Sequence, residues 1–204
     1  MSDIRKIETY LEAKGWTRKI AGNADFDAAL KAIKLADEER KGLLISGVFG
    51  VGKTRLAELI ARAFAEFYGF NYRKIELGNP QDVEKLDPDW GELWSEDLHA
   101  EVVLLDDIGA ETATNDYGII TEPVARFLTV RHNRLVTAAA RAAAGILDGR
   151  SAKPFPMVFG TTNLNAVKFD DRYSGRVSSR NKDLFIPLPL TGKDKRLWTT
   201  PTTR

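Results

Sequence analysis

The sequence predicts an α/β fold in which a parallel sheet is covered by helices on both faces. The first observation is a glycine-rich loop over residues 47–54, which lies between an apolar run and a segment whose apolar residues recur at helical spacing. That order of strand, loop and helix is the setting of a phosphate-binding loop. The second is the run over residues 102–105, which is apolar at every position, as are strands buried on both faces of a parallel sheet.

The glycine-rich loop fits the pattern G-x-x-x-x-G-K-[ST] at every fixed position. Its glycines allow backbone N–H groups to surround a polyphosphate, and the helix that begins near Lys53 directs the positive end of its dipole to the same anion. We expect Lys53 to reach the β and γ phosphates and the Thr54 hydroxyl to ligate magnesium. The predicted nucleotide-binding residues are Gly47, Val48, Phe49, Gly50, Val51, Gly52, Lys53, Thr54 and Arg55.

Two carboxylates, Asp106 and Asp107, follow the apolar run over residues 102–105. Ligands of parallel sheets bind at the carboxyl ends of the strands, which is where these side chains are expected to lie. We expect Asp106 to hold magnesium through water and Asp107 to polarise an attacking water. An aspartate that caps a helix after a strand is common, so the prediction depends on the glycine-rich loop upstream.

A further strand is expected over residues 157–159, and it places Asn163 at the same edge of the sheet. Its neutral amide is suited to orienting a water molecule or contacting the γ-phosphate. The alternative is that Thr162 and Asn163 form a helix cap or an ordinary turn.

The other elements are predicted from the spacing of apolar residues and from Gly and Pro breaks. Residues 79–98 are acidic and hold Trp90 and Trp94, which share one face of a possible short helix. Packing or protein contact is favoured there over base stacking, because the carboxylates would repel a phosphate backbone. Helices are expected over residues 3–14, from Asn23 or Asp25 to about Arg40, and over 56–64, 123–133 and 136–147; strands over 43–46, 72–77, 102–105, 157–159 and 184–188.

Composition excludes several classes of protein. With 43% hydrophobic residues, the 204-residue chain can form one core, and it has no cysteine for disulfides or a thiolate zinc site. The two histidines, His99 and His132, are isolated, so we expect surface or packing roles for them. No apolar stretch approaches a membrane span and no signal peptide is present, which predicts a cytoplasmic protein with no membrane partner.

The net charge of +1 hides an asymmetry along the chain. Residues 1–122 hold 15 Lys and Arg against 24 Asp and Glu, whereas residues 123–204 hold 15 against 5. This split favours a basic C-terminal part that faces nucleic acid, phosphate or an acidic neighbour, and it favours head-to-tail self-association. The alternative is that both parts interleave in one fold and their charges mix on its surface.

Five motifs together resemble the ATPase domain of the bacterial helicase-loader and transposition-helper AAA+ proteins, which are DnaC-like and IstB-like. They are GVFGVGKT, VVLLDDIGAE, FGTTNL, RYSGRVSSR and TGKDKR, and the resemblance covers roughly residues 24–196. It implies a five-stranded parallel sheet, no C-terminal lid domain, and ATP with Mg²⁺ bound between subunits of a head-to-tail homo-oligomer. We divide the chain into a short N-terminal helical appendage (residues 1–22), an AAA+ ATPase domain (23–196) and a flexible tail (197–204).

The resemblance also implies roles for individual residues. Asn163 matches the sensor residue of the family, and either Arg180 or Arg176 matches the arginine finger that reaches the γ-phosphate of a neighbouring subunit. Arg180 is favoured, and the alternative is that the two arginines form surface ion pairs on a helix. Arg196 resembles a second arginine near the nucleotide.

The function that the resemblance implies is ATP-controlled assembly on single-stranded DNA, on a replicative helicase, or on both. A transposition helper with the same core and another DNA-processing partner is the first alternative. A P-loop kinase of small molecules is the second alternative. Such kinases usually have a mobile arginine-rich lid, whereas the TTN and SSR segments fit the AAA+ pattern better. Few residues precede the core and the segment over residues 79–98 is short and acidic, so the identity of the partner stays open.

Overall fold

The structure, a computed structural model, describes residues 3–84, 86, 100–111, 114–116, 119–144 and 157–192. Its centre is a five-stranded sheet in the order β2-β3-β6-β1-β7, with every neighbouring pair parallel. This confirms the predicted α/β fold and its strand number. The strands are β1 (Gly42–Ser46), β2 (Tyr72–Glu76), β3 (Val102–Ile108), β6 (Met157–Thr162) and β7 (Phe185–Pro189).

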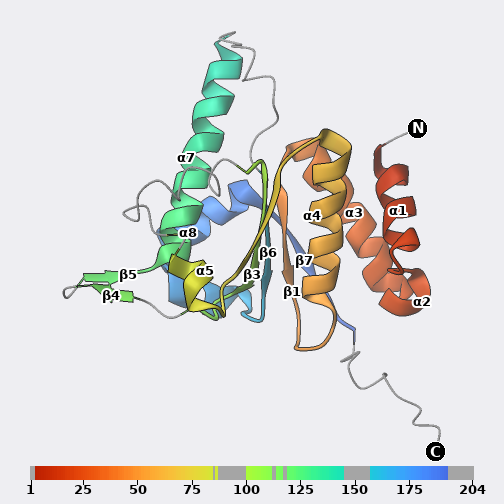
Figure 1. Cartoon of the computed structure of the whole chain (residues 1–204), viewed down its shortest axis with the longest axis horizontal. Helices are drawn as coiled ribbons and strands as arrows, with labels where there is room; N and C mark the ends of the chain where they lie inside the picture. The colour runs from red at the N-terminus through yellow and green to blue at the C-terminus, as the bar shows by residue number, and fades with distance from the viewer. Residues whose placement is uncertain are drawn as a thin grey trace, which may run out of the picture.

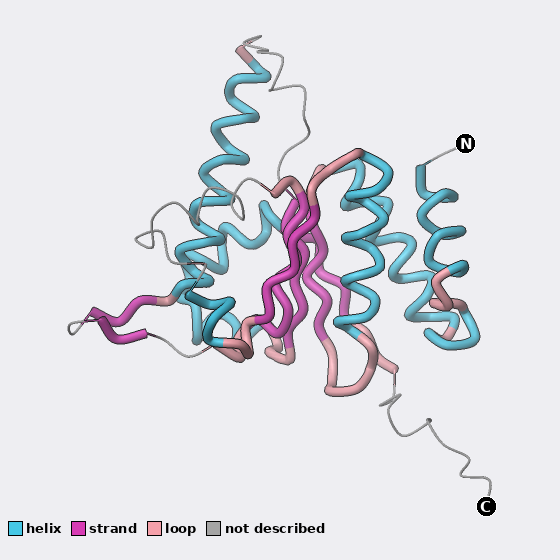
Figure 2. Tube along the Cα trace, viewed as in Figure 1, coloured by secondary structure: helices cyan, strands magenta, loops and turns pink. Residues whose placement is uncertain are grey.

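Helices cover both faces of this sheet (Figures 1 and 2). On one face lie α4 (Lys53–Tyr68) and α3 (Asn23–Glu39), with α1 (Asp3–Ala13) and α2 (Arg18–Ala21) outside them. On the other face lie α5 (Pro80–Glu84), α7 (Pro123–Ala143) and α8 (Ala166–Leu184). Among the described residues, no helix is both long enough and apolar enough to cross a membrane.

The two parts of the chain with opposite charge lie mainly on opposite sides of the sheet. The helices of the basic part, α7 and α8, cover one face, and α1 to α4 of the acidic part cover the other (Figure 1). The strands of the two parts interleave, and α5 of the first part lies on the same face as α7 and α8. Helices α7 and α8 hold 9 Lys and Arg against 3 Asp, whereas α1 to α4 are nearly balanced, with 9 Lys and Arg against 10 Asp and Glu, so the basic face keeps its excess charge and the opposite face is close to neutral.

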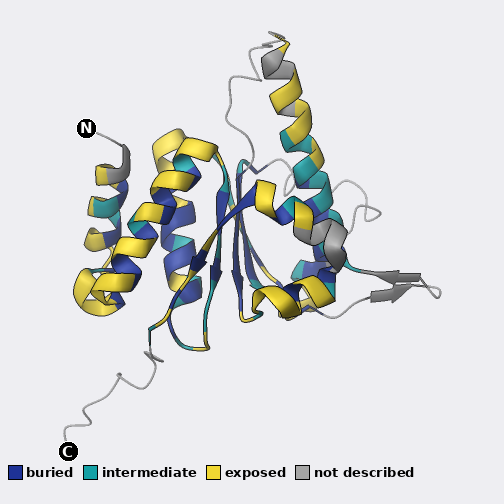
Figure 3. Cartoon of the chain, turned by 180° about the vertical axis from the view of Figure 1, so that it is seen from behind, coloured by how far each residue is buried: buried dark blue, intermediate teal, exposed yellow. Residues whose placement is uncertain are grey.

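Two apolar clusters hold the layers together, one on each face. Strands β3 and β6 lie in the middle of the sheet and are buried almost throughout, as their continuous apolar runs predict (Figure 3). The N-terminal helices belong to the same core: Ile7 and Leu11 of α1 are buried, and Trp16 stacks on Phe26 of α3 with ring centroids 4.9 Å apart.

Helix α7 corrects one prediction. A single helix runs over Pro123–Ala143, where two separate helices were expected over residues 123–133 and 136–147. No Gly or Pro lies between residues 133 and 136, so nothing interrupts the backbone there. Arg131 anchors this helix: it is buried, and both terminal nitrogens donate to the carbonyl of Ala100, at 3.0 and 3.1 Å. Burial lowers the pKa of Arg131 to about 9.

Other differences concern short elements and strand ends. Strand β3 extends to Ile108, beyond the predicted end at residue 105, with an irregular register between Leu105 and Ile108. Helix α2 and the hairpin of β4 (Thr114–Asp116) and β5 (Ile119–Thr121) were not predicted, because such short elements carry little periodic signal. Trp90, Trp94 and residues 145–147 and 197–204 lie outside the described residues.

Asp25 connects helix α3, near the start of the chain, to the segment that follows β7. It lies in the first turn of α3 and is only 6% exposed, while Gly22 occupies the cap position that the sequence suggested for Asn23 or Asp25. Its carboxylate accepts hydrogen bonds from the backbone N–H and hydroxyl of Thr191, at 3.1 and 2.9 Å, and from the Gly192 N–H, at 3.1 Å. The segment after β7 is thereby fixed to α3.

We predict that Asp25→Ala lowers the free energy of unfolding by about 2–4 kcal/mol, because three hydrogen bonds to a buried carboxylate are lost. Chemical denaturation measures the change. The matched control is Asp27→Ala on the same helix, which removes an exposed ion pair with Arg18 and should cost less than about 1 kcal/mol. Equal costs for the two variants would contradict the structural role of Asp25.

Candidate functional site

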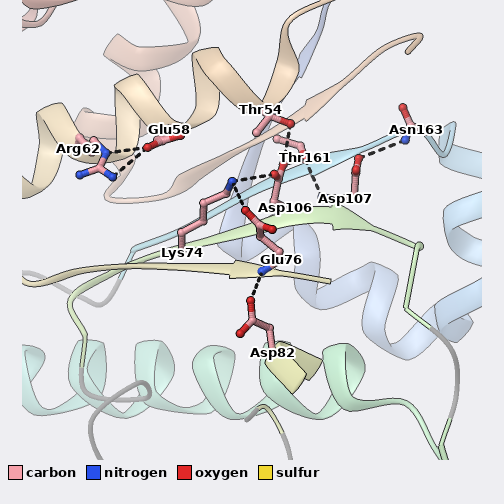
Figure 4. Close-up of polar contacts among 10 residues, drawn as sticks. All are labelled: Thr54, Glu58, Arg62, Lys74, Glu76, Asp82, Asp106, Asp107, Thr161 and Asn163. Carbon is pink, nitrogen blue, oxygen red and sulfur yellow. Dashed lines mark hydrogen bonds and ion pairs between the residues drawn. The ribbon is translucent and has the colours of Figure 1, made fainter. Parts of the chain in front are cut away.

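The predicted site residues meet at the carboxyl edge of the sheet, where β1, β6 and β3 are neighbours. The glycine-rich loop connects β1 to α4, the two aspartates lie near the end of β3, and Asn163 follows β6. Figure 4 shows Thr54, Asp106, Asp107, Thr161 and Asn163 gathered at this edge. Residues far apart in the sequence therefore form one polar cluster.

All three glycines of the loop have positive φ. Gly52 has φ of 98° and caps α4, which begins at Lys53. Gly47 has φ of 152°, and a Cβ there would lie 2.7 Å from the backbone oxygen of Leu190. The loop is thus packed against the segment that follows β7, and the first N–H groups of α4 face the loop.

Lys53 is almost fully buried, with 6% of its surface exposed. Its ammonium donates to the carbonyls of Gly47 and Val48, at 2.9 and 3.0 Å, and to Oδ1 of Asn163, at 2.7 Å. These acceptors hold a positive charge at the mouth of the loop, beside the end of β6.

Asp106 is the most highly connected carboxylate of the cluster. Its Oδ1 accepts from the hydroxyls of Thr54 and Thr161, at 2.9 and 2.7 Å, and its Oδ2 lies 3.2 Å from the Lys74 ammonium on β2. Burial tends to lower the pKa of Lys74, but hydrogen bonds and charges from Glu76 and Asp106 outweigh it, and the pKa is raised. Lys74 therefore stays charged beside Asp106.

Asp107 adopts an unusual backbone conformation, with φ of 62°. A non-glycine residue there stores of the order of 1–2 kcal/mol of strain. The Asp107 N–H donates to the Thr161 hydroxyl oxygen at 2.8 Å, and Oδ1 of Asp107 accepts from Nδ2 of Asn163 at 3.2 Å. Asn163 consequently bridges Lys53 and Asp107.

The remaining predicted residues lie apart from this cluster or outside the described structure. Arg180 lies on α8 and donates to the hydroxyl of Thr129 on α7, at 2.9 Å. Arg176 belongs to the same helix, and Arg196 is outside the described residues. Arg55 is exposed on α4, with its guanidinium 3.4 Å from the backbone oxygen of Lys14. Within the loop itself, Val51 is buried, whereas Val48 and Phe49 are 63% and 67% exposed.

Sequence reasoning missed Thr161 and Lys74. Thr161 is the hydroxyl that links both aspartates, and the signal for it is a polar residue at the buried end of an otherwise apolar strand. Lys74 could not be found without the sheet order, because only the pairing of β2 with β3 places it beside Asp106.

The fold is shared with known proteins. The crystal structure of the DnaC helicase loader superposes with a TM-score of 0.59 and 22% identity, covering 82% of this chain and 90% of that chain. The crystal structure of DnaI gives a TM-score of 0.58 and 21% identity, covering 88% of this chain and 94% of that chain. This chain therefore shares the α/β fold of these two proteins. Its described part shows no helix after β7. No family model matches the sequence, and no curated protein matches it.

Proposed function

We propose that this protein binds and hydrolyses ATP and acts as a DnaC-like helicase loader. The observation that carries the proposal is the convergence of Lys53, Thr54, Asp106, Asp107 and Asn163 at one sheet edge beside a helix N-terminus. These are the side chains that a P-loop ATPase needs around a triphosphate. The fold that this chain shares with the DnaC helicase loader also supports this proposal.

The residues fit ATP and Mg²⁺ by their chemistry. The loop N–H groups and Lys53 would hold the phosphates, and Thr54 and Asp106, whose oxygens are 2.9 Å apart, would hold the metal. The described residues contain no group of three or more His, Asp or Glu side chains suited to a metal. Mg²⁺ would take phosphate oxygens and waters as further ligands and would neutralise charge on the transferred group.

The remaining residues have separate proposed roles in orienting water and contacting the nucleotide. Asp107 has one oxygen held by Asn163, which leaves its carboxylate oriented to accept a hydrogen bond from an attacking water. Asn163 also contacts Lys53, so phosphate binding at Lys53 would change the partners of the side chain that orients Asp107. Arg196, and Arg55 near the start of α4, are proposed as further contacts to the nucleotide.

An arginine finger supplied by a neighbouring subunit would complete the site. Within its own chain Arg180 contacts Thr129 on α7 rather than the loop, which agrees with a role in trans. We propose a head-to-tail homo-oligomer in which Arg180, with Arg176 as the alternative, reaches the nucleotide of the next subunit.

The proposed partners are single-stranded DNA and a replicative helicase. The segregation of the basic helices α7 and α8 on one face supports an anionic partner there. A transposition helper would use the same site with a transposase, and copurification with a helicase or with a transposase separates the two. A small-molecule kinase would instead transfer phosphate to a metabolite as a monomer.

We predict that Lys53→Ala lowers ATP turnover at least about 100-fold, because a buried charge at the phosphates is removed. Phosphate release at saturating ATP measures it, with thermal melting to check that the variant folds. Lys34→Ala, an exposed change on α3, is the control and should keep full turnover. Undiminished turnover in Lys53→Ala would remove the nucleotide site from residues 47–54.

Arg180→Ala should bind nucleotide nearly as well as the parent chain but lose most of its turnover. Mixed with Lys53→Ala, it should recover activity, because an intact loop in one subunit can meet an intact finger in the next. Lys182→Ala on the same helix is the control and should retain turnover on its own. If both variants assemble and the mixture stays inactive, the trans finger is wrong.

We further predict binding to single-stranded DNA that weakens steeply with salt, with a slope of log affinity against log salt of about −2 or steeper. Fluorescence anisotropy with labelled oligothymidine at several salt concentrations measures it. Binding that ignores salt, or no binding at all, would leave only protein partners for the basic face.

A further inference from the structure

Glu111 is a buried carboxylate that the proposed chemistry does not use. It ends the motif VVLLDDIGAE and is only 3% exposed. Burying a carboxylate is costly unless it is paired and hydrogen-bonded, so its partners indicate what it does. These partners come from two places: the turn that follows Asp107, and helix α8.

The turn fixes Glu111 relative to Asp107. The Ala110 N–H donates to the Asp107 carbonyl at 2.9 Å, and the Gly109 N–H donates to Oε2 of Glu111 at 2.8 Å. Gly109 has φ of 100°, and a Cβ there would lie 2.6 Å from the side chain of Leu164, next to Asn163. The turn therefore has little freedom to move independently of the nucleotide-site residues.

Helix α8 meets the other oxygen of the same carboxylate. The hydroxyl of Tyr173 donates to Oε1 of Glu111, and the Arg172 guanidinium lies 3.5 Å from that oxygen. Arg172 also donates to the backbone oxygen of Glu111 and lies 3.7 Å from Glu122, just before α7. The Glu111 carboxylate thus joins the turn after β3 to α8, and Arg172 in turn joins α8 to the residue before α7.

Helix α8 also carries Arg180. Tyr173 and Arg180 are seven residues apart, so they lie on the same side of the helix, about 10 Å from each other along its axis. A change in the angle of α8 at Tyr173 would therefore be carried to the Arg180 side chain, which contacts α7 two turns further on.

We infer that Glu111 is a positioning residue for the arginine finger. Through Tyr173 and Arg172 it fixes the position of α8, and therefore of Arg180, relative to the strand of the same subunit that carries Asp106 and Asp107. The inference rests on the proposed function. It means that Glu111 serves the site of the neighbouring subunit rather than its own, although it follows the aspartates of its own site in sequence. The competing explanation is that Glu111 orients Asp107 and serves its own site.

Mixing experiments separate these explanations. Glu111→Gln keeps the shape but removes the charge that pairs with Arg172 and one of the acceptors, so turnover of the pure variant should fall at least about tenfold. Mixed one to one with Lys53→Ala, it should recover, with about a quarter of the interfaces pairing an intact loop with an intact finger. Mixed with Arg180→Ala, it should stay inactive, because no subunit then offers a well-placed finger.

The opposite pattern overturns the inference. Recovery with Arg180→Ala and none with Lys53→Ala would mean that Glu111 acts on its own site. Full turnover of pure Glu111→Gln would remove any role in hydrolysis. The mixture of Arg180→Ala with Lys53→Ala is the reference: if it alone fails to recover while both variants assemble, the proposed trans finger is wrong and this inference falls with it.

Tyr173→Phe provides a second variant if Glu111→Gln does not fold. It removes only the hydroxyl, so the apolar contact of the ring with Phe169 is kept. The same pattern of recovery is expected with a smaller loss of turnover. Tyr10→Phe, a hydroxyl removal on α1 remote from the site, is the matched control and should leave turnover and mixing behaviour unchanged.

Discussion

The site depends on the carboxylate of Asp106, which receives a hydroxyl from α4, a hydroxyl from β6 and an ammonium from β2. These three contacts join the helix after the loop to the middle of the sheet and to its edge strand. Without a charged acceptor at this point, Thr54, Thr161 and Lys74 would each lose a partner in a partly buried place. The loop, the strand ends and the lysine are therefore held in register by the contacts of one side chain.

Thr161 extends this arrangement to Asp107. Because its oxygen accepts from the Asp107 N–H while its hydrogen goes to Asp106, one side chain sets the geometry of both aspartates. The left-handed backbone at Asp107 is then compensated by a hydrogen bond on each side of the residue, to Thr161 and to Asn163. Strain of this kind is maintained only where neighbouring contacts determine the conformation, which is the case at this edge of the sheet.

Much of this could be predicted from the sequence because it is encoded locally. The glycine-rich loop has a fixed pattern, and the runs that form β3 and β6 are apolar without interruption, so strand positions and the sheet edge followed from periodicity. Lys74, Glu111 and Asp25 could not be assigned in the same way. Each acquires its role from a partner on another element, and only the order of the strands and the packing of α3 and α8 bring those partners near. Helix α7 was divided wrongly, since no Gly or Pro interrupts the chain between residues 133 and 136.

The contact between Asp25 and Thr191 has a consequence for how the chain acquires its structure. The two residues are 166 positions apart, so the contact closes a loop that contains all five strands of the central sheet. A contact of this range raises the contact order of the protein and carries a large loop-closure cost. During synthesis on the ribosome, the wall of the glycine-rich loop formed by Leu190 stays incomplete until the last strand has emerged. A chain that is still being translated therefore lacks one wall of the glycine-rich loop.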